Sequence, residues 1–132
     1  MLARDEALNR IHEAYAARVR GDKEALSRYW ADGATFRIAG APSLVRDVPL
    51  SGATPMEAIA KLIDQFTFSD LTLVDAVVDG NKVAAHWQVT ITPGNGKGET
   101  TQLFDLIELD DDGKIKSLTQ FADTALMRHM AG

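Results

Sequence analysis

The strongest constraint on the fold is a change in hydrophobic periodicity at Phe66. Before this residue, apolar side chains recur every three or four positions, as in helices that cover a core along one face. After it, apolar and polar residues alternate through segments rich in β-branched side chains, and turn sequences such as 79–81 and 110–113 separate these segments. Helices followed by strands predict a segregated α+β domain.

The individual elements follow from capping and turn residues. A first helix ends at Gly21, and a capping box at 54–57 with Pro55 at the first helical position begins another. We expect helices over 23–30, 55–66 and 124–130, an antiparallel meander over 67–79, 82–92, 100–109 and 114–122, and a short strand near Phe36. Residues 40–53, with two prolines and two glycines, predict an irregular connection that could serve as a lid.

The chain has 132 residues, which predicts a single domain over 1–132. Long strands make a curved, cone-shaped sheet, mixed or antiparallel. We expect the N-terminal helices to pack on its concave face and to enclose an apolar pocket.

Composition excludes several classes of function. Without cysteine, the chain has no disulfide, thiolate zinc site, iron–sulfur cluster or cysteine nucleophile. Its three histidines show no metal-ligand spacing, and no glycine-rich phosphate loop is present, so we expect neither a metal nor another cofactor. A formal net charge of −5 disfavours nucleic acid as a partner.

The sequence also predicts the cellular location of the protein. No apolar run approaches the roughly 18 residues of a membrane span. The first residues are charged and do not resemble a signal peptide. We therefore expect a cytoplasmic protein with no membrane partner.

Several turns and strand ends resemble those of a known superfamily, the nuclear transport factor two-like proteins, and within it the SnoaL-like and ketosteroid-isomerase-related branch. The resemblance covers about residues 8–130, and its motifs are 21–22, 30–36, 78–84, 112–115 and 121–125. It implies the cone fold and a small-molecule pocket. Members include isomerases, polyketide cyclases, dehydratases, epoxide hydrolases and non-catalytic binding domains.

The isomerase chemistry of this superfamily can be compared position by position. An aspartate base there removes a proton next to a ketone, while a tyrosine and a protonated aspartate stabilise the enolate oxygen. The resemblance places the base on Ile38 and the oxyanion tyrosine on Ala14, with Tyr15 one residue away. It places the oxyanion aspartate on Asp105. Isoleucine cannot move a proton, so steroid isomerisation by that mechanism is not expected.

Two carboxylates remain as acid–base candidates. Asp123 matches the carboxylate that follows the last strand in the SnoaL-like cyclases. We favour the interpretation that Asp123 is the N-cap of the closing helix. Asp105 lies in an apolar strand, where a buried acid would have a raised pKa. Alternation leaves its direction open, because the set with Leu103 and the set with Phe104 are both largely apolar.

Other side chains could meet a ligand. The predicted pocket wall comprises Trp30, Phe36, Ile38, Phe66, Trp87 and Leu103. Arg18 and Arg37 could receive a carboxylate or keto oxygen. A salt bridge with one of the 19 acidic residues is the interpretation favoured for both.

These observations lead to one leading hypothesis and one alternative. The first is an isomerase, cyclase or dehydratase that uses Asp105, Asp123 and Tyr15 for acid–base chemistry on an apolar, cyclic, aromatic or carbonyl compound. The alternative is a non-catalytic ligand-binding or assembly domain. The apolar outer set of the 100–109 strand predicts a homodimer through the convex sheet face.

Overall fold

The structure is a computed structural model that describes residues 1–40 and 54–131. All but Gly40 of the segment predicted as a connection or lid lies outside these residues. The elements are α1 (Arg4–Arg20), α2 (Lys23–Ser27), β1 (Trp30–Ile38), α4 (Pro55–Gln65), β2 (Phe66–Asp79), β3 (Lys82–Pro93), β4 (Glu99–Leu109), β5 (Ile115–Phe121) and α5 (Thr124–Ala131). This order confirms the α+β prediction.

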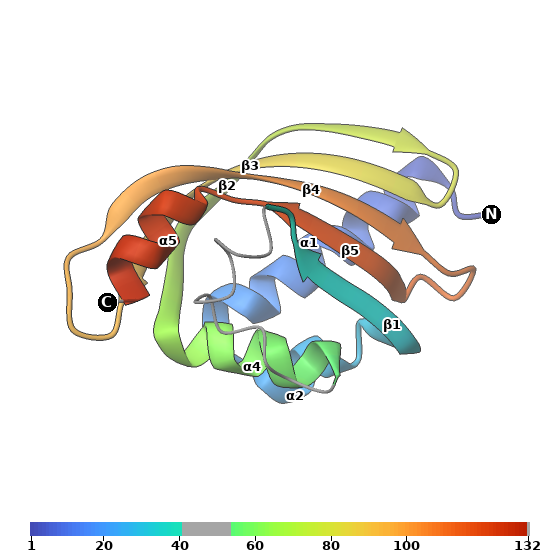
Figure 1. The fold of residues 1–132 in the computed structure, drawn as a ribbon. Coiled ribbons are helices and arrows are strands. Elements are labelled where there is room, and N and C mark those ends of the chain that lie inside the picture. Colours follow the sequence, from blue (N-terminus) through green and yellow to red (C-terminus); the bar gives the residue numbers. More distant parts are fainter. Residues whose placement is uncertain (41–53, 132) are drawn as a thin grey trace.

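The strands form one five-stranded sheet in the order β1-β5-β4-β3-β2. β2 to β5 make the predicted antiparallel meander, and β1 joins at the edge, parallel to β5. The sheet arches over α1, α2 and α4, while α5 covers one end (Figure 1). The helices therefore lie on its concave side.

The helix ends form as their residues predict, with one exception. Gly21 ends α1 in the left-handed conformation, with φ 69°, and Thr54 Oγ1 caps α4 by accepting a hydrogen bond from Glu57 N at 3.2 Å. The helix expected over 23–30 is too long, because α2 ends at Ser27. Ile115 N donates to Tyr29 O at 2.6 Å, so the chain enters the sheet at Trp30.

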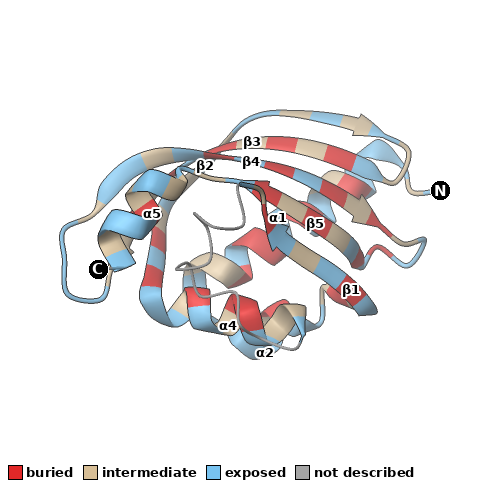
Figure 2. Cartoon of the chain, in the orientation of Figure 1, coloured by how far each residue is buried: buried red, intermediate tan, exposed pale blue. Residues whose placement is uncertain are grey.

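The core lies between the concave face and the helices. Buried positions alternate along β3 and β4 and gather on one side of α1 and α4 (Figure 2). On β4 the buried set is Leu103, Asp105, Ile107 and Leu109. Asp105 is thus a carboxyl group in the interior of the domain. No helix within 1–40 or 54–131 has both the length and the apolarity to cross a membrane.

Candidate functional site

A pocket lies between the concave face of the sheet and the helices. Three of the lining residues that the structure describes are polar: Tyr15 and Arg18 from α1, and Gln120 from β5. The other described lining residues are apolar: Ala14, Leu26, Trp30, Phe36, Ile59, Leu62, Phe66, Phe68, Ile91, Leu103, Ile115, Leu118 and Met127. The site is therefore an apolar chamber with a few polar groups, as is typical of small-molecule sites.

The free space in this pocket is small. Its volume is about 60 Å³, whereas an apolar cavity that holds benzene measures about 150 Å³. A ring-sized ligand therefore needs lining side chains to move. Met127, contributed by α5, is the most adaptable of them because its unbranched side chain has three rotatable bonds.

Asp105 lies at the centre of a polar group behind the pocket wall. It is 0% exposed, and the strand register places it between Ala85 of β3 and Gln120 of β5. The Tyr15 hydroxyl donates a hydrogen bond to Asp105 Oδ2, and Gln120 Nε2 approaches the same oxygen at 3.5 Å. Alternation left open which face of the sheet Asp105 occupies. The structure shows that it points inward and forms hydrogen bonds with two side chains that line the pocket.

Burial controls the charge of this carboxyl group. Removal from water disfavours the carboxylate and raises the pKa of Asp105 to about 8, against a smaller opposing effect of the Gln120 hydrogen bond. Within the described residues, the second oxygen, Oδ1, is buried without a hydrogen-bond partner. Asp105 is therefore a neutral acid at pH 7 and can donate a proton.

The aromatic rings fix the position of Tyr15. Its ring stacks on Trp87 with centroids 4.3 Å apart and an interplanar angle of 20°. Trp87 is buried behind Tyr15 and is not one of the residues that line the pocket. It supports the tyrosine from β3 and limits the directions in which the hydroxyl can point.

The predicted pocket wall agrees in part with the observed one. Trp30, Phe36, Phe66 and Leu103 line the pocket, and so does Tyr15, which was predicted as a catalytic residue. Ile38 is buried on β1 but, like Trp87, does not line it.

Gln120 was not among the candidates expected from the sequence. Period-two alternation from Leu118 on β5 places it on the inner face, and this signal could have identified it.

Asp123 lies outside the pocket. It is exposed, and its Oδ1 accepts a hydrogen bond from Leu126 N at 3.0 Å at the start of α5. The favoured N-cap interpretation agrees with this geometry. A role in chemistry inside the pocket does not fit it.

Arg18 differs from the favoured sequence interpretation, because it forms no salt bridge with a described carboxylate. Its Nη2 instead donates to the main-chain oxygens of Phe66 at 2.8 Å and Leu62 at 3.4 Å. Burial lowers its pKa to about 10, so the guanidinium stays charged at neutral pH. The pocket wall therefore contains a cation.

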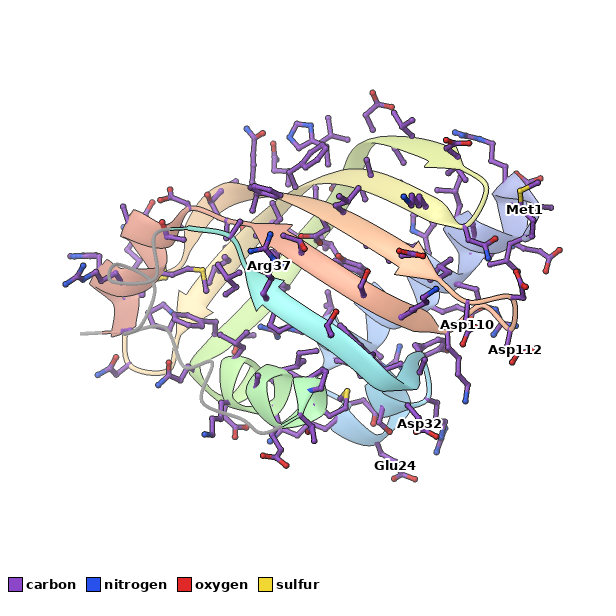
Figure 3. All side chains as sticks on the ribbon, turned by 45° about the vertical axis from the view of Figure 1, so that its right-hand side comes forward. Met1, Glu24, Asp32, Arg37, Asp110 and Asp112 are labelled. Atoms are coloured by element: carbon purple, nitrogen blue, oxygen red, sulfur yellow. The ribbon has the colours of Figure 1, made fainter. Side chains whose placement is uncertain are left out.

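Arg37, the other arginine candidate, lies at the periphery, as do several carboxylates that were not candidates. Arg37 is exposed on β1, and Glu24, Asp32, Asp110 and Asp112 project outward at one end of the molecule (Figure 3). Asp110 Oδ1 accepts hydrogen bonds from the main chain of its own turn, at 3.0 and 2.9 Å. In the described part of the chain, no three acidic or histidine side chains gather as metal ligands do.

Comparison with known proteins places this geometry in context. A family model for the SnoaL-like domain matches residues 11–118. A comparison with the curated proteins finds no match.

Solved structures show the same fold. An NTF2-like protein from Burkholderia xenovorans LB400 has a TM-score of 0.75 at 20% identity, over 100% of both chains. TerC, co-crystallised with polyporic acid, has a TM-score of 0.75 at 15% identity, over 96% of this chain and 98% of the other. An epoxide hydrolase from M. tuberculosis, described as LEH-like, has a TM-score of 0.70 at 14% identity, over 96% and 90%.

Proposed function

The chain belongs to the SnoaL-like domain family of the NTF2-like superfamily, and we propose that it is a small-molecule enzyme that works by side-chain acid–base chemistry. Its substrate is an apolar cyclic or carbonyl compound, and the reaction is an isomerisation, a cyclisation or a dehydration. The observation that carries this proposal is the hydrogen bond between Asp105, a buried neutral acid, and Tyr15, which lines the pocket.

In this proposal Tyr15 is the catalytic residue that meets the ligand. Asp105 does not line the pocket, so it acts through the tyrosine as a positioning and proton-donating residue. When a carbonyl oxygen binds, protonated Asp105 donates to Tyr15 Oη, and the tyrosine O–H turns to donate to the ligand oxygen. Both donors act in a site of low dielectric, where they stabilise developing negative charge more strongly than water does.

The solved relatives support a small-molecule role. One is an epoxide hydrolase and another was crystallised with polyporic acid, so the same fold accommodates organic ligands in other chains. The apolar lining of the present pocket suits a ligand of similar character.

The alternative is a non-catalytic binding module. The resemblance and one observation favour it. The resemblance places the base of the related isomerases on Ile38, which cannot accept a proton. Among the described residues, Asp105 is the one buried carboxyl group, so no second buried carboxylate is present to act as the base. A pocket that only sequesters a ligand needs no proton donor, so the two functions differ in what substitution of Asp105 does.

Exchange of α-protons in D₂O tests the enzyme proposal with cyclohexanone as the probe. Tyr15 and Asp105 donate to the carbonyl oxygen while solvent water removes the α-proton and returns a deuteron, so we expect the protein to accelerate deuterium incorporation next to the carbonyl, measured by ¹H NMR. Asp105→Asn and Tyr15→Phe should lose most of that acceleration. Asp112→Asn, which changes an exposed carboxylate, is the matched control and keeps the full rate. Binding of cyclohexanone without acceleration by the native protein favours the binding module.

We also propose that the convex sheet face packs against a second copy of the chain. Phe104 and Phe121 face each other in register there, with ring centroids 6.4 Å apart, and are 46% and 50% exposed. Leu106 and Val77 both pair with Ala84 of β3, lie on the same face and extend the exposed apolar surface. A patch of this kind is typical of interfaces.

The cytoplasmic location stays part of the proposal. A chain without cysteine makes no use of the oxidising conditions in which disulfides form.

A further inference from the structure

The pocket wall combines apolar side chains with one guanidinium group. Arg18 lies three residues after Tyr15 on α1, so the two side chains share one helix face, and both line the pocket. The side chain emerges among Phe66, Phe68 and Leu62. A charge in such surroundings requires compensation.

The contacts of Arg18 fix the guanidinium without neutralising it. Both hydrogen bonds to main-chain oxygens come from Nη2, and the guanidinium carbon lies 3.7 Å from the centroid of the Phe68 ring. Arginine carries five N–H donors in a planar fork. Nε and Nη1 make no hydrogen bond to a described residue, so part of the fork is free for another partner.

The partner that best satisfies this group is an anion with two oxygens. A carboxylate matches the planar fork, and such charge-assisted pairs are stronger in a water-poor site. The described residues supply no carboxylate to Arg18. Asp105, the buried acid, is occupied by Tyr15 and Gln120. A ligand that carries a carboxylate would supply the anion that the described residues do not.

We propose that the pocket selects organic acids, in which an apolar ring carries a carboxylate that pairs with Arg18. This inference rests on the proposed ligand-binding role of the same pocket. Because Tyr15 is one helical turn from Arg18, a molecule anchored at the guanidinium places a second group near the tyrosine hydroxyl. Arg18 is then the residue that determines specificity, and Tyr15 is the residue that faces the reacting oxygen.

The test compares benzoate with benzamide, two probes of nearly equal shape that differ in charge. Their affinities at pH 7 are measured by protein-observed NMR titration for the native protein and for Arg18→Met and Arg18→Lys. We expect the native protein to bind benzoate at least about tenfold more tightly than benzamide, as one charge-assisted pair allows. Arg18→Met loses this preference and keeps its affinity for benzamide, and Arg18→Lys keeps part of the preference.

The possible results distinguish a failure of the proposed acid preference from a failure of the proposed ligand-binding function. Equal binding of both probes by the native protein overturns the acid preference and leaves the pocket intact. A preference that survives in Arg18→Met also overturns it. If neither probe binds, the proposed pocket function fails as well. If Arg18→Met does not fold, the affinities of the native protein for benzoate and benzamide still show whether the pocket prefers an acid.

Discussion

The hydroxyl of Tyr15 donates a hydrogen bond to Oδ2 of Asp105, a residue 90 positions further along the chain. The bond joins the first helix to the fourth strand at the wall of an apolar pocket. Tyr15 lines the pocket, so this hydrogen bond links the buried carboxyl group of Asp105 to the pocket.

Loss of the Tyr15 hydroxyl should destabilise the fold. Tyr15→Phe removes a donor and leaves a buried carboxyl oxygen poorly satisfied, which costs about 1 to 3 kcal/mol of unfolding free energy. Urea denaturation measures this change. Tyr29→Phe is the matched control, since that hydroxyl bonds Glu13 near the surface, and should cost less than about 0.5 kcal/mol. Equal losses in the two variants would contradict the account.

Asp105 should make the protein more stable as the pH falls from about 8 to about 4. Its native pKa is raised to about 8, so in this range the native state holds a proton that the unfolded state has released. The slope of this contribution is at most about 1.4 kcal/mol per pH unit. Asp105→Asn should remove it, as measured by denaturation at a series of pH values. Parallel curves for the native protein and the variant would contradict the prediction.

Asp123 should contribute to stability and not to the chemistry of the pocket. Asp123→Ala removes the acceptor for Leu126 N at the start of α5 and should cost about 1 kcal/mol. The rate of cyclohexanone exchange should stay at the native level. If Asp123→Ala lost the exchange rate and kept the native unfolding free energy, Asp123 would be a functional residue and not a helix cap.

A charge on the convex face should dissociate the proposed dimer. Phe104→Lys places an ammonium group in the apolar patch, and light scattering should then report a mass near 14.3 kDa in place of about twice that value. Ser27→Lys, an exposed change on α2, is the control and should leave the dimer intact. A monomeric native protein at all concentrations would contradict the proposed interface.

Local sequence signals predicted most of the fold. Capping residues such as Thr54 and turns such as 79–81 determine where elements begin and end through contacts within a few residues. The end of α2 was misplaced because a long-range hydrogen bond, from Ile115 N to Tyr29 O, decides it. Local propensity carries no information about such a partner.

The candidate site was predictable only in part, for the same reason. The resemblance singled out Asp105 and placed Tyr15 one residue from the position of the oxyanion tyrosine. Alternation on β4 could not orient Asp105, because both faces of that strand are largely apolar. Its burial and its bond to Tyr15 depend on the register with β3 and β5 and on the approach of α1. Arg18 was expected to form a salt bridge, since a single sequence cannot show that the acidic side chains within 1–40 and 54–131 stay out of its reach.

The most direct test of the central claim is a ¹³C NMR titration of the aspartate side-chain carboxyl groups, with Asp105→Asn to assign the resonance. The account predicts that one carboxyl group, that of Asp105, titrates with a pKa near 8 and is protonated at pH 7. An Asp105 resonance that titrates near the ordinary aspartate value of about 3.9 would contradict it. The group would then be a carboxylate at neutral pH, unable to donate the proton that the proposed chemistry requires.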